Sequence, residues 1–213
     1  MKKRENELEG GARPPGSVLE GAEAVLRPVS FGPFSALDKI RQAKSYRPAA
    51  LDAKIRSTRT RVEARLLVRA KEAGVPAPPV LAVGQRDIVI GKLGGRTLNK
   101  IEGGKIPAPV WKLAGKYLAK LHGAGIVHGD YTPANLMWNG KNGENLAVID
   151  FGLGSTSHDA EDFAVDVLTM KKALKGEKAQ AAFLAGYKSE GNARVLKHME
   201  QVEKRARYQD RGG

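Results

Sequence analysis

The stretch from His128 to Gly152 reads HGDYTPANLMWNGKNGENLAVIDFG, and it decides the fold of the chain. Asp130 and Asn135 stand five positions apart, and Asp150 opens a D-F-G triplet fifteen positions after Asn135. Phosphoryl transfer from ATP needs a carboxylate at the acceptor hydroxyl group and oxygen ligands for Mg²⁺. An H-x-D-x-x-x-x-N loop, a short hairpin and D-F-G supply these groups in that order. The spacing therefore predicts Asp130 as the catalytic base or acceptor-orienting residue, and Asn135 and Asp150 as metal ligands.

A polar loop that matches by accident is the alternative, and two motifs at the expected separation argue against it.

The composition narrows the class of protein further. The chain has 213 residues, of which 28% are charged and 41% are hydrophobic, as in a globular domain with its own core. It has no cysteine, which excludes disulfides, thiolate metal sites and cysteine nucleophiles. Because neither a membrane span nor a signal peptide is recognisable, we expect a soluble, cytoplasmic protein without membrane contact.

Basic residues outnumber acidic residues by 36 to 23, which gives the chain a net charge of +13. The segment from Lys39 to Lys71 alone holds eleven basic and two acidic residues. Such a cluster is typical of a surface that contacts the phosphate backbone of a nucleic acid. A solvated helix face is the alternative, and the charge does not separate the two.

The first part of the chain predicts strands followed by one long helix. Residues 19–25 suggest a strand, a tight turn and a strand, and Gly21 and Ala22 in the turn would lie over the phosphates of a nucleotide. A plain hairpin without this role is the alternative. Residues 51–73 repeat apolar side chains at helical spacing and stop at a Gly-Val-Pro sequence, which predicts a helix.

Lys39 precedes this helix and Glu63 lies within it. In kinases a strand lysine grips the α- and β-phosphates, and a helix glutamate holds that lysine in place. The order and spacing of Lys39 and Glu63 suit this ion pair. The alternative for Glu63 is an exposed partner of Arg59, four positions earlier on the helix.

Residues 80–90 read as a hairpin that turns near Gly84, and a flexible connector over residues 91–95 follows. A hinge between two lobes is expected there, with backbone groups of Gly91 and Leu93 facing the adenine edge. A second amphipathic helix, over residues 107–121, leads into the catalytic loop.

About seven residues separate D-F-G from the next helix, which opens near Asp159, and no A-P-E triplet follows. A long activation segment with a peptide-docking platform does not fit into this space. Asp166 in this helix either braces the catalytic loop or faces solvent. Residues 178–189 and 193–208 predict two further helices, and a basic tail closes the chain.

Taken together, these residues resemble the atypical small serine/threonine kinases of the KEOPS complex, the PRPK and Bud-thirty-two family, which is related to the RIO kinases. The likeness runs from about Val18 to Arg211 and is closest to the archaeal-type, single-domain form. Thr132 adds to it, because ordinary protein kinases carry lysine at that position. The specific marks are Glu20-Gly-Ala-Glu-Ala24, Lys39-x-Arg-x-x-Lys-x-Tyr-Arg47, Leu51-Asp…Ile-Arg56…Thr60-Arg-x-Glu-Ala-Arg-Leu-Leu67, His128-Gly-Asp-x-Thr132, Asp150-Phe-Gly-Leu153 and Glu161-Asp-x-Ala-Val-Asp166.

The resemblance implies an α+β, minimal bilobal protein-kinase-like fold. A small β-rich N-lobe with one long helix would be followed by a reduced helical C-lobe. The expected division is a flexible tail over residues 1–16, an N-lobe over 17–91, a C-lobe over 92–203 and a basic tail over 204–213.

The resemblance also implies ATP and Mg²⁺ as cofactors, with Lys39 and Asp130 as catalytic residues and Glu63 pairing with Lys39. The metal would lie on Asn135 and Asp150. The chain would act as a kinase or ATPase that supports threonylcarbamoyladenosine formation in tRNA. Its expected partners are the threonylcarbamoyl transferase subunit, other KEOPS subunits and, through the complex, tRNA. The alternatives are a small-molecule phosphotransferase and a catalytically silent, nucleotide-gated scaffold or RNA-binding subunit.

Overall fold

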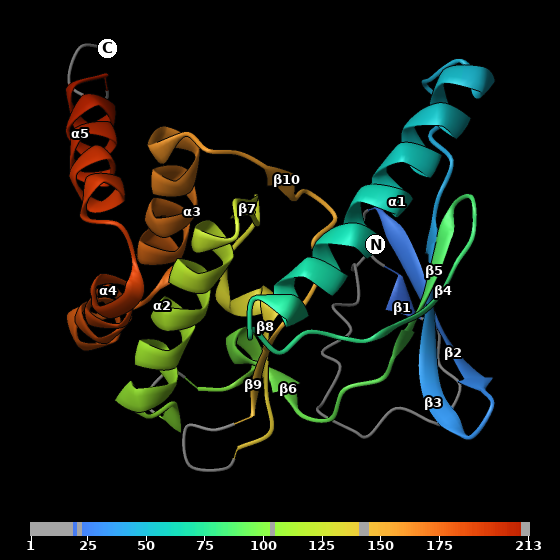
Figure 1. Ribbon diagram of the computed structural model, residues 1–213, viewed down its shortest axis with the longest axis horizontal. Coiled ribbons are helices and arrows are strands. Elements are labelled where there is room, and N and C mark those ends of the chain that lie inside the picture. Colours follow the sequence, from blue (N-terminus) through green and yellow to red (C-terminus); the bar gives the residue numbers. More distant parts are fainter. Residues whose placement is uncertain (1–18, 21–22, 103–104, 141–144, 210–213) are drawn as a thin grey trace, which may run out of the picture.

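The computed structural model describes residues 19–20, 23–102, 105–140 and 145–209, so the predicted tail over residues 1–16 lies outside the described residues. Figure 1 shows an N-terminal sheet with one long helix against it, followed by a part built mainly of helices. The predicted α+β architecture is therefore confirmed. None of the described helices is long and apolar enough to cross a membrane.

The N-terminal sheet is antiparallel, with the strand order β1-β2-β3-β5-β4. Gly32, with φ of +58°, opens the turn between β2 and β3. β2 continues through Pro28 beyond its short pairing with β1, and on that side Pro28 has no strand partner among the described residues. A proline, which lacks the amide hydrogen, is tolerated at such an edge position. The strands are β1 (Leu19–Glu20), β2 (Ala24–Phe31), β3 (Phe34–Arg41), β4 (Val80–Val83) and β5 (Asp87–Gly91).

Helix α1 (Ala49–Glu72) lies against this sheet and matches the predicted helix over residues 51–73. Its buried side includes Leu66 and Leu67, and also the charged residues Asp52 and Glu63. Lys39 and Arg41 are two positions apart on β3, so both side chains point to the same face of the sheet. Both side chains are buried. The sheet and the helix thus enclose charged groups as well as apolar ones.

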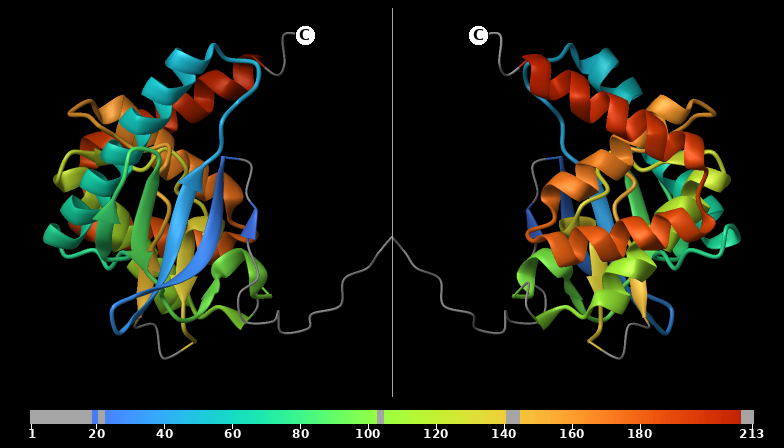
Figure 2. Two further views of the ribbon diagram at one scale, coloured as in Figure 1. Left: turned by 90° about the vertical axis from the view of Figure 1, so that its right-hand side faces the viewer. Right: turned by 90° about the vertical axis from the view of Figure 1, so that its left-hand side faces the viewer.

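The C-terminal part holds short strands and four helices among the described residues, and Figure 2 shows the helices from both sides. β6 pairs with β8 and β8 with β9, whereas β10 pairs with β7. The short elements are β6 (Arg96–Thr97), η1 (Leu98–Lys100), β7 (Ile126–Val127), η3 (Pro133–Asn135), β8 (Leu136–Trp138), β9 (Leu146–Val148) and β10 (Ser155–Thr156). The helices are α2 (Ala108–Gly123), α3 (Ala160–Ala173), α4 (Glu177–Glu190) and α5 (Ala193–Gln209).

Two glycines let α2 and α4 pack closely. A Cβ atom at Gly115 would lie 2.0 Å from the carbonyl oxygen of Phe183, and one at Gly186 would lie 1.9 Å from that of Lys112. Any larger residue at either position would push the two helices apart. Because α2 leads directly into β7 and the catalytic loop, this packing fixes the base on which the loop stands.

Candidate active site

The catalytic loop begins at His128, directly after β7, and its backbone shape depends on one glycine. Gly129 has φ of +78°, and a Cβ atom there would lie 2.3 Å from the carbonyl oxygen of Leu153. Both the conformation and the close approach require glycine. His128 itself is buried, and its Nε2 lies 3.2 Å from the carbonyl oxygen of Ile149. His128 and Gly129, the first two residues of the loop, therefore both hold it against the D-F-G segment.

Asp166 on α3 braces this loop. Its side chain is buried and accepts hydrogen bonds from the amides of His128 at 2.6 Å and Gly129 at 2.9 Å. Of the two roles left open by the sequence, the structure thus selects the bracing role over a solvent-facing one. Two backbone amides on one carboxylate fix the direction in which the chain enters Asp130.

A buried histidine completes this brace, and the sequence analysis did not find it. His122 on α2 lies with Nδ1 2.8 Å from the hydroxyl group of Tyr187 and Nε2 3.3 Å from Asp166 Oδ2. Its ring stacks on Phe163, with the ring centres 4.5 Å apart. Burial lowers the pKa of His122 below its ordinary value, although Asp166 works in the opposite direction. The neutral ring can accept from Tyr187 and donate to Asp166, so α2, α3 and α4 are joined beneath the loop.

Asp130 and Asn135 face each other across the loop. Asn135 Nδ2 donates to Asp130 Oδ2 at 2.8 Å and to the Asp130 carbonyl oxygen at 2.9 Å. These bonds hold the Asp130 carboxylate in place. Because the amide nitrogen of Asn135 is engaged in this way, its Oδ1 atom is left to act as an oxygen ligand.

The β8–β9 hairpin returns the chain to the same place. Leu136 pairs with Val148, and the amide of Ile149 donates to the carbonyl oxygen of Asn135 at 2.9 Å. Asp150 follows at once, with φ of +60°, which is uncommon for a residue other than glycine. The hairpin between the two motifs therefore brings Asn135 and Asp150 to neighbouring positions.

Lys39 joins the N-terminal sheet to this site. Its Nζ atom lies 2.6 Å from Glu63 Oε1 and 2.7 Å from Asp150 Oδ1. Burial alone would raise the pKa of Asp150, but the Lys39 ammonium group and the Gly152 amide lower it overall. Glu63 is buried, unlike the exposed partner of Arg59 that was the alternative, and Arg59 instead contacts Glu23. The structure thus brings Lys39, Glu63 and Asp150 together.

Arg41 is a second cation on Glu63 that the sequence analysis missed. Its Nη2 atom contacts Glu63 Oε2, while Lys39 contacts Oε1 of the same carboxylate. Arg41 lies two positions after Lys39 on β3, so strand alternation was the available signal. Glu63 is therefore held by two buried cations rather than by one.

The remaining predicted residues are placed differently. Gly21 and Ala22 lie outside the described residues. Gly91 ends β5, and its amide donates to the Pro79 carbonyl oxygen at 2.9 Å, so this N–H group is already engaged. Leu93 follows and is half-buried. In the described part of the chain, no hydrogen bond or ion pair joins Gly91 or Leu93 to Lys39, Glu63 or Asp150.

The oxygen groups at this site suit Mg²⁺ held jointly with phosphates. Within the described ranges, Asn135 Oδ1 and Asp150 Oδ2 accept no hydrogen bond. The same ranges contain no group of three histidine or carboxylate side chains that could hold a metal alone. Mg²⁺ in nucleotide sites is usually bound by one or two carboxylates together with substrate phosphates. Asn135 and Asp150 fit that pattern.

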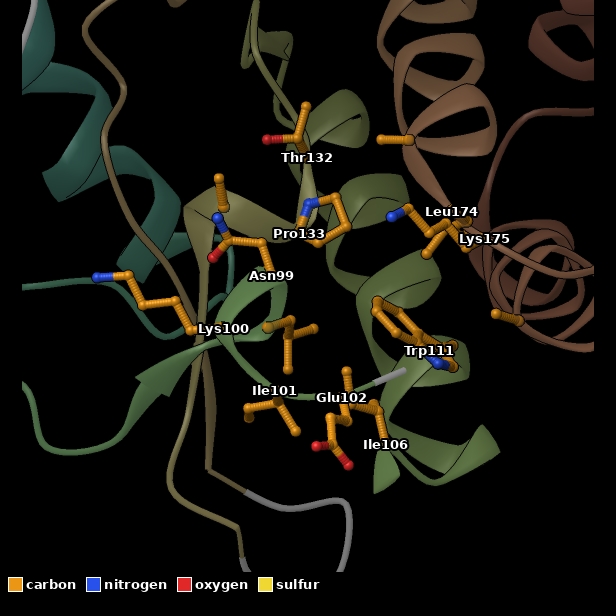
Figure 3. A pocket seen from close by; sticks show the side chains of 14 residues that line it. Asn99, Lys100, Ile101, Glu102, Ile106, Trp111, Thr132, Pro133, Leu174 and Lys175 are labelled. Atoms are coloured by element: carbon orange, nitrogen blue, oxygen red, sulfur yellow. The ribbon is translucent and has the colours of Figure 1, made fainter. Parts of the chain in front are cut away.

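A cavity of about 610 Å³ adjoins the catalytic loop near Thr132 and Pro133 (Figure 3). Thr132, Pro133 and Ala134 of the loop form one wall, and Trp111 and Leu174 are among its apolar lining residues. Among the described residues that line it, Glu102 is the only acidic one, and Lys100 and Lys175 are basic. The cavity thus offers an apolar interior with mixed charges beside the part of the catalytic loop that follows Asp130.

Comparisons with known proteins agree with this geometry. The model of the phosphotransferase enzyme family matches residues 124–198, which contain the catalytic loop, D-F-G and α3. The Rio2 kinase of Chaetomium thermophilum, solved as an ADP/Mg²⁺-phosphoaspartate complex, superimposes with a TM-score of 0.61 at 14% identity. That comparison covers 91% of this chain and 70% of the Rio2 chain. At this level of identity it shows the protein-kinase-like fold.

Two sequence relatives are considerably closer. A probable serine/threonine-protein kinase BUD32 homolog of Archaeoglobus fulgidus is 35% identical over 179 residues, which cover 81% of this chain and 88% of the relative. A probable bifunctional tRNA threonylcarbamoyladenosine biosynthesis protein of Methanoculleus marisnigri is 37% identical over 200 residues. This match covers 91% of the chain but only 36% of the bifunctional protein, so the chain spans about a third of that relative's length.

Proposed function

Because this chain belongs to the family of the BUD32 kinase homologues, we propose that it transfers the γ-phosphoryl group of Mg-ATP to a serine or threonine hydroxyl group or to water. The observation that carries the proposal is the meeting of Lys39 and Asp150, 2.7 Å apart, beside the Asp130–Asn135 pair. A kinase needs these four groups in one place, and they come from distant parts of the sequence. We place the boundary between the two lobes near Gly91.

Each residue has a defined task in this proposal. Lys39, held by Glu63, binds the α- and β-phosphates, and Asp130 orients the acceptor and takes its proton. When bound, Mg²⁺ neutralises charge on the phosphates, and Asn135 and Asp150 would hold it there. Asn135 also keeps the Asp130 carboxylate aimed through its amide nitrogen. The Asp166 brace maintains the loop geometry on which all of this depends.

We also propose that the chain works in a tRNA-modifying assembly of the KEOPS type. The name of the bifunctional relative, which refers to tRNA threonylcarbamoyladenosine biosynthesis, supports this role. The proposed partners are the threonylcarbamoyl transferase subunit, the other subunits of that complex and tRNA. The net charge of +13 suits an assembly that holds a nucleic acid.

A small-molecule phosphotransferase is the second candidate, because the matching family model describes phosphotransferases in general. Such an enzyme with a cationic acceptor would need acidic groups near Asp130. Among the described residues, the cavity beside Thr132, Pro133 and Ala134 is lined by one acidic residue, Glu102, against Lys100 and Lys175. This charge balance favours a polypeptide hydroxyl group or water over a cationic small molecule.

The test follows the γ-phosphoryl group. The chain is incubated with γ-labelled Mg-ATP, first alone, then with the transferase partner and tRNA, and separately with an aminoglycoside. The proposal expects label in protein serine or threonine or in free phosphate, and no label in these reactions when Asp130→Ala replaces the wild-type chain. Label in the aminoglycoside would instead identify the chain as a small-molecule phosphotransferase.

A further inference from the structure

A second hollow lies at the N-terminal end of α1, where the first turns of the helix project beyond the sheet (Figure 1). It has a volume of about 190 Å³. Among the described residues that line it, Glu23 is the only acidic one and five are basic, so we call this hollow the basic pocket. The five basic residues are Arg41, Lys44, Arg47, Arg56 and Arg59.

Arg41 forms a fixed wall of the basic pocket. Its side chain is only 5% exposed and is held on one side by Glu63. Its Nε atom is buried and has no hydrogen-bond partner among the described residues. A buried donor without a partner is costly, so the Arg41 side chain keeps unused hydrogen-bonding capacity beside the pocket.

Charges around the pocket leave an excess of cations. Asp52 lies 2.6 Å from Arg56 and 3.8 Å from Arg47, which fixes these two guanidinium groups in place. Although burial opposes it, the hydrogen bond from Arg56 lowers the pKa of Asp52, so this carboxylate is ionised at neutral pH. Among the described residues, the four lining guanidinium groups of Arg41, Arg47, Arg56 and Arg59 face three carboxylates, Asp52, Glu63 and Glu23. The site is thus preorganised by its own ion pairs and still positive.

Glu23 occupies the place that an external anion would take. Its Oε2 atom accepts a hydrogen bond from Arg59 at 2.9 Å and forms a longer ion pair with Arg41 at 3.7 Å, so it contacts two walls of the pocket at once. Its side chain is 47% exposed, whereas Asp52 and Glu63 are buried. Among the three carboxylates, Glu23 is therefore the one that a phosphate group can displace.

Tyr46 gives the pocket an aromatic rim. It lines the pocket, is 73% exposed, and lies with its ring centre 5.0 Å from the guanidinium carbon of Arg47. Exposed aromatic rings beside cationic grooves are typical of surfaces that stack the bases of single-stranded nucleic acid. One nucleotide of a bound strand could therefore place its phosphate in the pocket and its base on the Tyr46 ring.

We propose that the basic pocket binds a phosphodiester group of RNA, that Glu23 fills it when RNA is absent, and that Tyr46 stacks on the adjoining base. The choice of RNA over other phosphate-bearing partners rests on Tyr46 and on the proposed function in tRNA modification. The phosphate chemistry itself rests only on the pocket and is tested independently of ATP turnover.

The experiment measures two affinities on the full chain. Inorganic phosphate is titrated by NMR, and a tRNA transcript is titrated by fluorescence anisotropy at several salt concentrations. The variants are Arg59→Gln, Glu23→Gln and Tyr46→Ala, all at partly or largely exposed side chains that leave the core intact. Arg65→Gln is the matched control, because Arg65 is exposed on the same helix, lies outside the pocket and loses the same charge.

Each variant has its own expected result. Arg59→Gln lowers both affinities about tenfold, the effect of one lost charged hydrogen bond. Glu23→Gln raises both affinities, because the competing carboxylate is gone. Tyr46→Ala lowers only the tRNA affinity, and Arg65→Gln changes phosphate binding by less than about twofold.

Three results would overturn the proposal. Phosphate binding that Arg59→Gln leaves unchanged would show that the pocket is no anion site. Unchanged or weaker phosphate binding in Glu23→Gln would reject the role of Glu23. A Tyr46→Ala protein with full tRNA affinity would reject RNA as the occupant. ATP turnover is recorded for the wild-type chain in parallel, so a failure of the kinase proposal is seen separately.

Discussion

Lys39 Nζ lies 2.6 Å from Glu63 Oε1 and 2.7 Å from Asp150 Oδ1, so one ammonium group joins β3, α1 and the D-F-G segment. The two carboxylates differ in their surroundings. The Glu63 side chain is 3% exposed and is also held by Arg41, whereas the Asp150 side chain is 49% exposed. Glu63 therefore anchors Lys39, and Asp150 is the partner from which Lys39 can separate when a metal and phosphates bind.

Replacing Asp150 by alanine tests the metal assignment. We expect Asp150→Ala to abolish turnover of Mg-ATP, because a second metal ligand beside Asn135 is lost. Phosphate release is the measurement, with a thermal melt to show that the variant is folded. Turnover at the wild-type rate would contradict the assignment of Asp150.

Lys39→Ala tests the phosphate contact. Loss of one cation at the phosphates is expected to lower kcat/KM for ATP about a hundredfold. The matched control is Lys92→Ala, a lysine exposed just after β5. If both variants keep the wild-type kcat/KM, Lys39 has no role at the phosphates.

Glu63→Gln is expected to destabilise the fold. The substitution removes the shared carboxylate and leaves Lys39 and Arg41 buried as neighbouring cations without it. Breaking a buried ion pair in this way costs about 3–5 kcal/mol of unfolding free energy, which urea denaturation measures. Glu72→Gln, at the exposed end of the same helix, is the control and should unfold as the wild type does. Equal midpoints for the two variants would argue against the two-cation arrangement.

His122 predicts how stability depends on pH. Burial holds its pKa in the folded protein below the ordinary value of 6.5, so the unfolded chain binds more protons just below that pH. Stability is therefore expected to fall as the pH drops from 7 through 6.5 toward the folded-state pKa. The slope of unfolding free energy against pH should become shallower in His122→Gln. The exposed His158→Gln serves as control, and equal slopes in both variants would refute the prediction.

Local patterns in the sequence predicted much of the fold. The helix expected over residues 51–73 is α1 at Ala49–Glu72, and the hairpin turning near Gly84 is β4 and β5. The segment between the catalytic loop and D-F-G forms the expected hairpin of β8 and β9. These features depend on short-range periodicity and turn residues, which a single sequence contains.

The parts that escaped prediction depend on long-range packing. His122 and Tyr187 are 65 positions apart and meet only because Gly115 and Gly186 let α2 and α4 approach. Arg41 stood out in a family pattern, but its contact with Glu63 depends on how α1 lies on the sheet. For Asp166, the sequence offered two roles, and only the position of α3 beneath the loop selects one.

The most direct test of the account is phosphate release from Mg-ATP by the purified chain, alone and then with the transferase partner and tRNA. Asp130→Ala is measured beside the wild type. The account predicts turnover that partner and tRNA stimulate and that the variant loses. ATP binding without any turnover under all conditions would contradict it and would instead assign the chain to a nucleotide-gated scaffold.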